Sequence, residues 1–147
     1  MRLVVQRVEK ARVIKVDDAS IVGEIGKGLF VLVGMKKGDS EKDVEILTQK
    51  LSKLRVMSDK TGKMNLSVNE VGGSILVVSQ FTLHADTSGG NRPSFINAEE
   101  PERAKELYEF FVEQLKKNGI KVETGSFGDY MKIETLLDGP VTIIYSE

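Results

Sequence analysis

Apolar side chains recur at helical spacing in only two parts of the chain, and this limits the folds that the sequence can adopt. The first part begins at Ser40, which with Asp43 has the form of a capping box, and should end near Arg55. The second begins at Pro101, which suits the first position of a helix, and ends just before Gly119. The predicted core-facing positions are Val44, Leu47, Leu51, Leu54, Ala104, Leu107, Tyr108, Phe111, Val112 and Leu115.

Most of the remaining chain has the composition of β-strands, being rich in β-branched residues bounded by turn residues. The strand-like runs are 3–16, 21–25, 29–33, 75–83, 121–124, 131–136 and 141–145. We expect the first three to form an antiparallel meander with a buried third strand. Because helices do not alternate regularly with strands, the order predicts an α+β domain, with a mostly antiparallel, barrel-like sheet covered by two helices.

The composition excludes several common kinds of catalytic and metal-binding site. The chain has no cysteine and a single histidine, His84, which excludes thiol nucleophiles, thiolate metal sites and histidine clusters. Its formal charge is −1, so any RNA must be held by a local patch rather than by a general basic field. The chain has 147 residues and no apolar run near the length of a membrane span. We therefore expect a soluble, cytoplasmic protein with one domain over residues 1–147 and no contact with membrane or DNA.

Polar side chains gather where the predicted strand 75–83 ends. If the strand continues through this region, alternation places Gln80, Thr82 and His84 on one face and Ser79 and Phe81 on the other. A buried amide or hydroxyl is costly unless it is hydrogen-bonded, so Gln80 and Thr82 should either bond to neighbouring backbone or open onto a pocket. On the sequence alone, a structural role is the more common outcome, and His84 is more commonly a strand-end or surface residue than a catalytic base.

Two further segments have compositions that could serve a function. The loop from Ser88 to Phe95 combines glycines with Arg92 and an aromatic ring, which suits either a phosphate and a stacked base or a plain surface loop. Near the carboxyl end, Gly139-Pro140 separates two strand-like runs, and proline lacks the N–H that a central strand needs. We expect an exposed turn or sheet edge there.

Several short motifs, taken together and in this order, closely resemble the D-aminoacyl-tRNA deacylase family, also called the D-tyrosyl-tRNA deacylase family. The similarity covers essentially the whole chain and includes Leu54-Arg55 and residues 62–65. The main motifs are Gln6-Arg7-Val8, Ser79-Gln80-Phe81-Thr82-Leu83, Asn91-Arg92-Pro93-Ser94-Phe95, Gly125-x-Phe127-Gly128 and Gly139-Pro140-Val141-Thr142.

The resemblance implies a deacylase-type fold and an enzyme that hydrolyses the ester between a D-amino acid, or glycine, and the terminal adenosine of tRNA. Such an enzyme leaves L-aminoacyl esters intact. It also implies a homodimer in which Gly139-Pro140, joined by a cis peptide bond, enters the active site of the other subunit. Members of the family need no metal and no organic cofactor.

The resemblance also assigns roles within this chain. The backbone N–H groups of Phe81 and Thr82 are candidates for an oxyanion hole. We expect water, helped by the vicinal ribose hydroxyl of the substrate, to be the nucleophile rather than the Thr82 hydroxyl, because no base is evident beside it. Residues expected to shape the pocket or bind the substrate are Ser79, Gln80, Phe81, Phe95, Met131, Gly139 and Pro140, and Arg7 is expected to contribute by bracing the Gly139-Pro140 segment.

Two positions depart from the family pattern, and three other functions stay open. Asp129 stands where the family usually has alanine, and Leu137 where it often has asparagine. One alternative is a non-catalytic tRNA-binding module using Arg92 and Lys36-Lys37 for phosphate contacts. A second is a structural dimerisation domain. The third is a related editing deacylase with a trans Gly-Pro bond that accepts some L-alanyl esters.

Overall fold

The helices and strands follow one another in the predicted order, with three short elements that the sequence did not predict. A computed structural model describes residues 1–146. Its elements are β1 (Arg2–Lys15), β2 (Ile21–Ile25), β3 (Gly28–Gly34), α1 (Glu41–Ser52), β4 (Met57–Ser58), β5 (Met64–Leu66), β6 (Ser74–Ser79), the 3₁₀ helix η1 (Phe81–His84), α2 (Pro101–Lys117), β7 (Lys121–Thr124) and β8 (Met131–Ser146). The unpredicted ones are β4, β5 and η1.

Most of the sheet is attached to β1, which is long and continuous. It has 14 residues, so a shorter neighbouring strand can pair with only part of it. The first half of β1 pairs antiparallel with β3 and the second half with β2, while β8 pairs antiparallel along nearly the whole strand. The predicted meander is therefore wrong, because β3 pairs with β1 and not with β2. Beyond β3, strands β6 and β7 are added in parallel.

The sheet curls until its two ends approach each other. Gly23 on β2 lies so close to the end of β7 that a Cβ atom built on it would be 2.3 Å from the carbonyl oxygen of Thr124. Only glycine allows backbones to approach this closely. The curled sheet encloses a small apolar cluster, whose members are Val8, Ala11, Val13, Ile25, Phe30, Leu76 and Val78. These features confirm the predicted α+β, barrel-like class.

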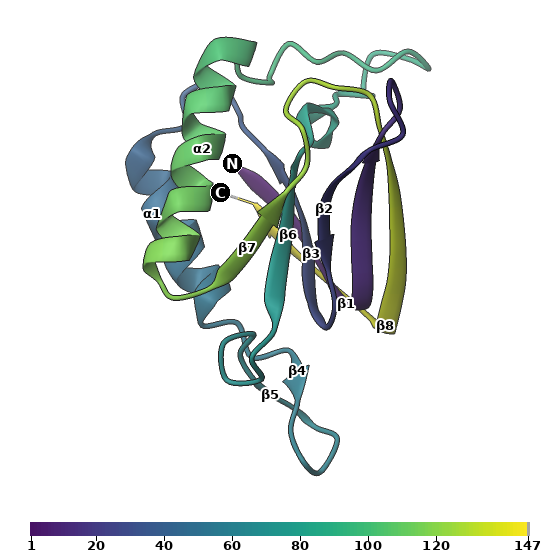
Figure 1. Cartoon of the computed structure of the whole chain (residues 1–147). Helices are drawn as coiled ribbons and strands as arrows, with labels where there is room; N and C mark the ends of the chain where they lie inside the picture. The colour runs from purple at the N-terminus through teal and green to yellow at the C-terminus, as the bar shows by residue number, and fades with distance from the viewer. Residues whose placement is uncertain (147) are drawn as a thin grey trace.

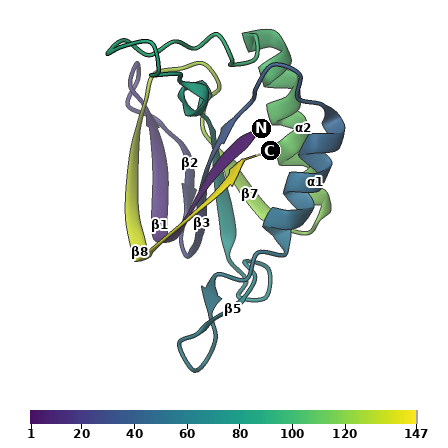
Figure 2. The same cartoon turned by 180° about the vertical axis from the view of Figure 1, so that it is seen from behind.

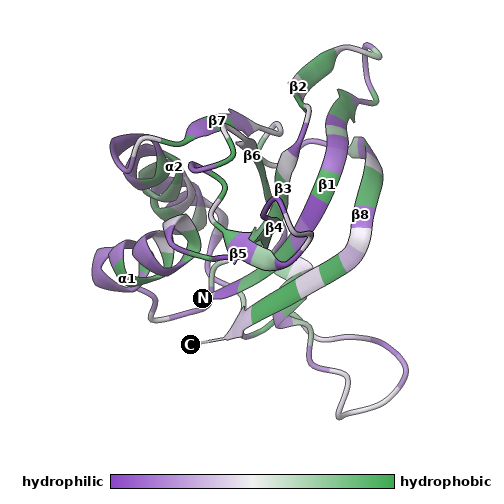
Figure 3. Ribbon diagram, turned by 90° about the horizontal axis from the view of Figure 1, so that it is seen from below, coloured by the Kyte–Doolittle hydropathy of each residue, from purple (hydrophilic) through white to green (hydrophobic). Residues whose placement is uncertain are grey.

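Both helices cover the same face of the sheet, where they lie side by side (Figures 1 and 2). Figure 3, seen from below, shows hydrophilic positions along their outer sides. Their inner sides join the main core, whose fully buried members include Leu47, Leu51, Leu107, Phe111 and Leu115. The amphipathic spacing seen in the sequence therefore corresponds to burial on one face.

The helix ends match the sequence signals with one exception. Asp43 accepts hydrogen bonds from the backbone N–H of Ser40 at 2.8 Å and from its hydroxyl at 2.6 Å. These bonds cap the N-terminus of α1. The prediction that this helix ends near Arg55 is wrong, because the helix stops at Ser52. Leu54 still packs against the core, but from the turn that follows the helix. The apolar side chain of Leu54 has the spacing expected for a further helical turn, although the residue lies in the turn after the helix.

Three predicted strands have the wrong limits. The run 75–83 leaves the sheet after Ser79, and η1 follows. The runs 131–136 and 141–145 are parts of one strand, β8, so Gly139-Pro140 does not form a turn between two strands. Instead the register against β1 shifts, with Val8 opposite Leu137 and Gln6 opposite Thr142. The extra residues bulge out of an edge strand, where proline needs no ladder partner. The Gly139-Pro140 bond is cis.

Candidate active site

A cavity of about 770 Å³ lies where β6 ends. It is bordered by the segment after β3, the end of β6, η1, the approach to α2 and the start of β8 (Figure 1). Five of the residues predicted for the site line it, namely Ser79, Gln80, Phe81, Phe95 and Met131. Segments that are far apart in the sequence therefore meet around one groove.

The backbone turns sharply at Gln80, and this turn creates the floor of the groove. The Gln80 N–H still donates to the carbonyl of Val33 at 2.8 Å, so it is the last residue held by the sheet. The N–H groups of Leu83 and Ala85 then donate to the carbonyls of Gln80 and Thr82. The first N–H groups of a helix have no partner within it. Here those groups belong to Phe81 and Thr82, and neither donates to another described residue.

The side chains of this turn do not alternate as a strand would require. Gln80 and Thr82 are hydrogen-bonded to each other, with the Gln80 amide donating to the Thr82 hydroxyl at 2.5 Å. Phe81 is 55% exposed and meets Phe95 edge to face, with ring centroids 5.0 Å apart. Thr82 itself is exposed and does not line the groove. The predicted strand face is wrong, because the chain is helical from Phe81. Gln80 and Thr82 do lie together, but His84 does not join them.

The opposite wall is formed by the segment between β7 and β8. The Ser126 N–H contacts the Met131 sulfur at 3.2 Å, and a Cβ atom on Gly125 would lie 3.1 Å from the same sulfur. Gly125 thus leaves room for Met131, which lines the groove as predicted. Phe127 packs on the ring of Tyr108, with centroids 5.7 Å apart. The Tyr108 hydroxyl donates to the carbonyl of Val77 at 2.9 Å, and burial raises its pKa.

Charged residues lie at the rim of the groove. Asp129 accepts a hydrogen bond from the Ser126 hydroxyl and pairs with the Lys15 ammonium at 3.0 Å. These two contacts lower the pKa of Asp129, so this departure from the family pattern places an ionised carboxylate at the rim. Lys37 also lines the groove and pairs with Glu100 at 3.5 Å.

The other predicted residues lie at the opposite end of the sheet. Val8 pairs with Gly28, and Gly28 with Ser74, so Arg7 and its surroundings are near the start of β6. The 6-residue strand β6 separates this end from the groove by about 16 Å. In Figures 1 and 2, β8 bends sharply at the end of the sheet that is far from η1. One chain alone therefore does not bring Gly139-Pro140 to its own groove.

Arg7 holds the segment before Gly139 in place. The residue is 9% exposed, and its side chain donates to the carbonyls of Asp138 at 3.2 Å and of Val56 at 2.8 Å. It also pairs with the Asp138 carboxylate at 3.1 Å. Gly139 and Pro140 are exposed beyond this anchor. The arrangement fits the bracing role that the resemblance assigned to Arg7.

Sequence reasoning missed several lining residues, because their positions depend on long-range contacts. Among them, Phe127 belongs to a motif that was noted for the resemblance but given no role. The others include Met35, Ile96, Ala98, Glu99, Glu100, Ala104, Tyr130 and Ile133, together with Pro101, which served only as a helix signal. His84 is buried outside the groove, with its Nε2 3.0 Å from the carbonyl oxygen of Gly34. The described residues include no group of side chains suited to a metal ion and no helix able to span a membrane.

Comparison with solved structures defines the class of fold. A structure described as a probable eukaryotic D-amino acid tRNA deacylase superposes with a TM-score of 0.84, covering 98% of this chain and 97% of that one, at 14% identity. The c-Myc DNA unwinding element binding protein superposes with a TM-score of 0.92 over 100% of this chain and 99% of that one, at 38% identity. The fold is thus that of a D-amino acid tRNA deacylase.

The sequence places the chain within a particular family. The model of the family described as D-Tyr-tRNA(Tyr) deacylase matches residues 4–146. Proteins named D-aminoacyl-tRNA deacylase from Aquifex aeolicus and Thermosipho melanesiensis are 53% and 52% identical, each over 98% of this chain and at least 95% of the relative. The chain belongs to the D-aminoacyl-tRNA deacylase family.

Proposed function

We propose that this protein hydrolyses the ester bond of D-aminoacyl-tRNA and of glycyl-tRNA, and rejects L-aminoacyl-tRNA. Family membership over residues 4–146 supports the reaction class. The observation that carries the proposal within the structure is the turn after β6, where two backbone N–H groups that donate to no described residue lie next to a groove lined with aromatic and polar side chains. Such a groove suits an adenosine and the amino acid attached to it.

The N–H groups of Phe81 and Thr82 form the oxyanion hole in this mechanism. When water attacks the ester carbonyl, negative charge develops on its oxygen, and fixed N–H donors stabilise that charge. An aminoacyl ester is already reactive, so positioning and this stabilisation supply enough catalysis. The Thr82 hydroxyl accepts a hydrogen bond from Gln80, and no histidine, lysine or carboxylate contacts it among the described residues. Water assisted by the vicinal ribose hydroxyl is therefore the better nucleophile.

Chirality is selected by shape, because mirror-image amino acids carry the same chemical groups. Only a rigid wall placed where the L side chain projects can separate them. Gly139-Pro140 suits this role, since glycine permits close approach of its backbone and proline fixes its own φ angle. Glycyl esters have no side chain to clash, so the same wall admits them.

The wall belongs to a second copy of the chain. Gly139-Pro140 is exposed, anchored by Arg7, and about 16 Å from the groove of its own chain. Strand β8 pairs only with β1 among the described strands, so its other edge is open to a partner. The exposed apolar residues along β8 are Ile133, Leu136, Leu137 and Ile144. An open edge with apolar side chains supports a homodimer in which each subunit completes the other's site.

The activity is tested by incubating the purified protein with D-tyrosyl-tRNA in the presence of a chelator and following release of the amino acid. We expect release far faster than in buffer alone. Release only at the buffer rate, with tRNA still bound, would contradict the proposal and favour a non-catalytic tRNA-binding module. Rapid release from L-alanyl-tRNA would favour the related editing branch.

A further inference from the structure

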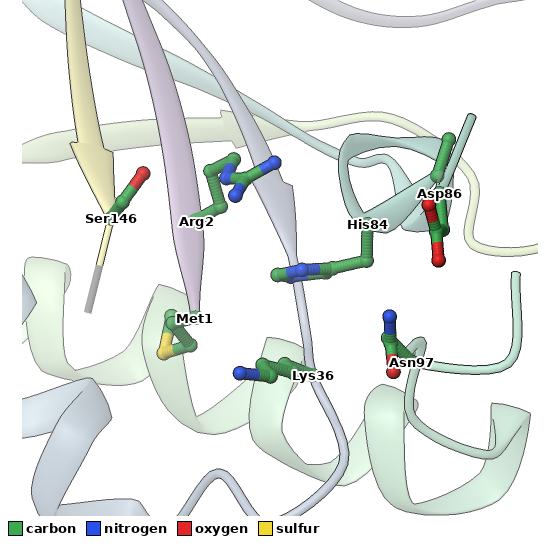
Figure 4. Close-up of a pocket in the computed structure, with 8 residues that line it drawn as sticks. Met1, Arg2, Lys36, His84, Asp86, Asn97 and Ser146 are labelled. Carbon is green, nitrogen blue, oxygen red and sulfur yellow. The ribbon is translucent and has the colours of Figure 1, made fainter. Parts of the chain in front are cut away.

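A second, smaller cavity of about 250 Å³ borders η1 but shares no residue with the candidate active site (Figure 4). The segments around Lys36 and Ala98 form an isolated antiparallel bridge that separates the two cavities. Alternation along these extended segments sends neighbouring side chains to opposite sides. Lys36 and Asn97 line the small cavity, whereas Lys37 and Ala98 line the candidate active site. A thin wall thus separates the two spaces.

The small cavity is positively charged on one side. Arg2 and Lys36 line it, and neither side chain pairs with a carboxylate among the described residues. Asp39 is bonded to two residues of the cavity lining through its own oxygens, which accept from the Met1 ammonium and from the Lys36 backbone N–H, each at 2.6 Å. The charges of Arg2 and Lys36 are therefore available to a ligand.

The cavity walls are fixed by hydrogen bonds. Arg2 donates to the carbonyl of Leu83 at 2.6 Å, and the buried His84 ring contacts the carbonyl of Gly34 at 3.0 Å. One carboxylate, that of Asp86, also lines the cavity and accepts from the Ser88 N–H at 2.9 Å. Figure 4 shows Asp86 on the far side of the His84 ring from Arg2 and Lys36. The basic side is thus prearranged and kept apart from the acid.

We propose that this cavity binds a backbone phosphate of the single-stranded 3′ end of tRNA, from a nucleotide shortly before the terminal adenosine. The inference rests on the proposed function, because it places that adenosine in the groove on the other side of the wall. A chain with a net charge of −1 must hold RNA through local cations. Lys36 and Arg2 supply two of these next to the site, together with an amide, Asn97, that can donate to a phosphate oxygen.

The test uses two substrates with the same reacting ester. D-Tyrosyl-tRNA carries the phosphates, whereas D-tyrosyl-adenosine has none. For Lys36→Gln we expect the KM for D-tyrosyl-tRNA to rise about threefold with kcat unchanged, as for the loss of one phosphate contact. The slope of log kcat/KM against log salt should become shallower by about 0.7. Hydrolysis of D-tyrosyl-adenosine should be unaffected. Lys60→Gln, an exposed lysine in the turn between β4 and β5, is the matched control and should change neither substrate.

Each outcome separates this inference from the proposed function. A Lys36→Gln protein with the KM and salt slope of the Lys60→Gln control overturns the phosphate site. Equal losses on both substrates also overturn it, because they indicate damage to the groove. If the wild-type protein hydrolyses neither substrate, the proposed function fails, and the salt dependence of uncharged tRNA binding still tests Lys36. Competition by inorganic phosphate that Lys36→Gln abolishes, without any change in salt slope, would assign the cavity to free phosphate instead.

Discussion

Substitutions of Thr82 distinguish two mechanisms, one in which its hydroxyl is the nucleophile and one in which its backbone N–H stabilises the oxyanion. Its hydroxyl is bonded by Gln80, whereas its N–H is free within the described chain. We expect Thr82→Ala to keep kcat within about tenfold of the wild-type value, because the N–H is retained, whereas loss of an essential nucleophile costs far more. Thr82→Pro removes the N–H and should lower kcat by about 10²–10³-fold.

Single-turnover hydrolysis of D-tyrosyl-tRNA measures both Thr82 variants, and circular dichroism checks that each is folded. A folded Thr82→Ala protein with less than about one part in 10⁴ of the wild-type kcat would restore threonine as the nucleophile. A folded, fully active Thr82→Pro protein would remove this N–H from the oxyanion hole.

Arg7 is the buried cation whose removal should cost most stability. Arg7→Ala leaves the buried carbonyl of Val56 without its donor and Asp138 without its charge partner. We expect the free energy of unfolding to fall by about 2–4 kcal/mol. Arg12, whose ion pair with Glu134 is exposed to solvent, provides the control, and Arg12→Ala should cause a much smaller change. Urea unfolding measures both variants, and equal losses would contradict the anchoring role of Arg7.

At the scale of elements, closure of the sheet depends on the approach of β2 to β7 at Gly23. A Cβ atom there would meet the Thr124 carbonyl at 2.3 Å, whereas a Cβ atom on Gly26 would meet nothing within 4 Å. Gly23→Ala should therefore lower the free energy of unfolding by about 2–3 kcal/mol, since backbone must move. Gly26→Ala should change it by no more than about 0.5 kcal/mol. Thermal unfolding compares them, and a neutral Gly23→Ala protein would show that the sheet is not closed at this point.

Local patterns predicted the elements well but not their pairing. The limits of β2 and β7 and the start of α2 match the sequence signals, because turn residues and Pro101 act on the chain close to themselves. The length of β1 was predicted, but its partners were not: β2 pairs with one half of β1 and β3 with the other, and local propensity does not decide between possible partners. The end of β6 was missed for a similar reason. Phe81 and Leu83 have strand-like side chains, yet the last sheet hydrogen bond is made by Gln80 with Val33, 47 residues earlier in the chain.

The site was predictable only in part. Ser79, Gln80, Phe81, Phe95 and Met131 could be named from the resemblance, and the fold brings them to one groove, whereas Thr82 lies outside its lining. Arg7 and Gly139-Pro140 could be named in the same way, but local sequence does not reveal that they lie at the other end of the sheet. Lining residues such as Ala98 and Tyr130 have no distinctive chemistry, so only their position in the fold identifies them.

At the scale of the whole molecule, we expect a dimer that buries the exposed apolar residues of β8. The protein should sediment with twice the subunit mass of 16.3 kDa at micromolar concentration. Leu137→Glu places a charge next to Gly139-Pro140 and should shift the equilibrium toward monomer and lower activity at low protein concentration. The control is Ile21→Glu, at a residue on β2 that is similarly exposed. A wild-type monomer, or a Leu137→Glu protein that dimerises like the control, would contradict this interface.

Chiral rejection is the central claim, and the ratio of two rates measures it most directly. D-Tyrosyl-tRNA and L-tyrosyl-tRNA, prepared on the same tRNA, are mixed separately with the purified protein and a chelator, and loss of each ester is followed. We predict rapid loss of the D ester, while the L ester decays at its rate in buffer. Equal loss of both esters would contradict selection by Gly139-Pro140, and loss of neither would contradict the deacylase activity itself.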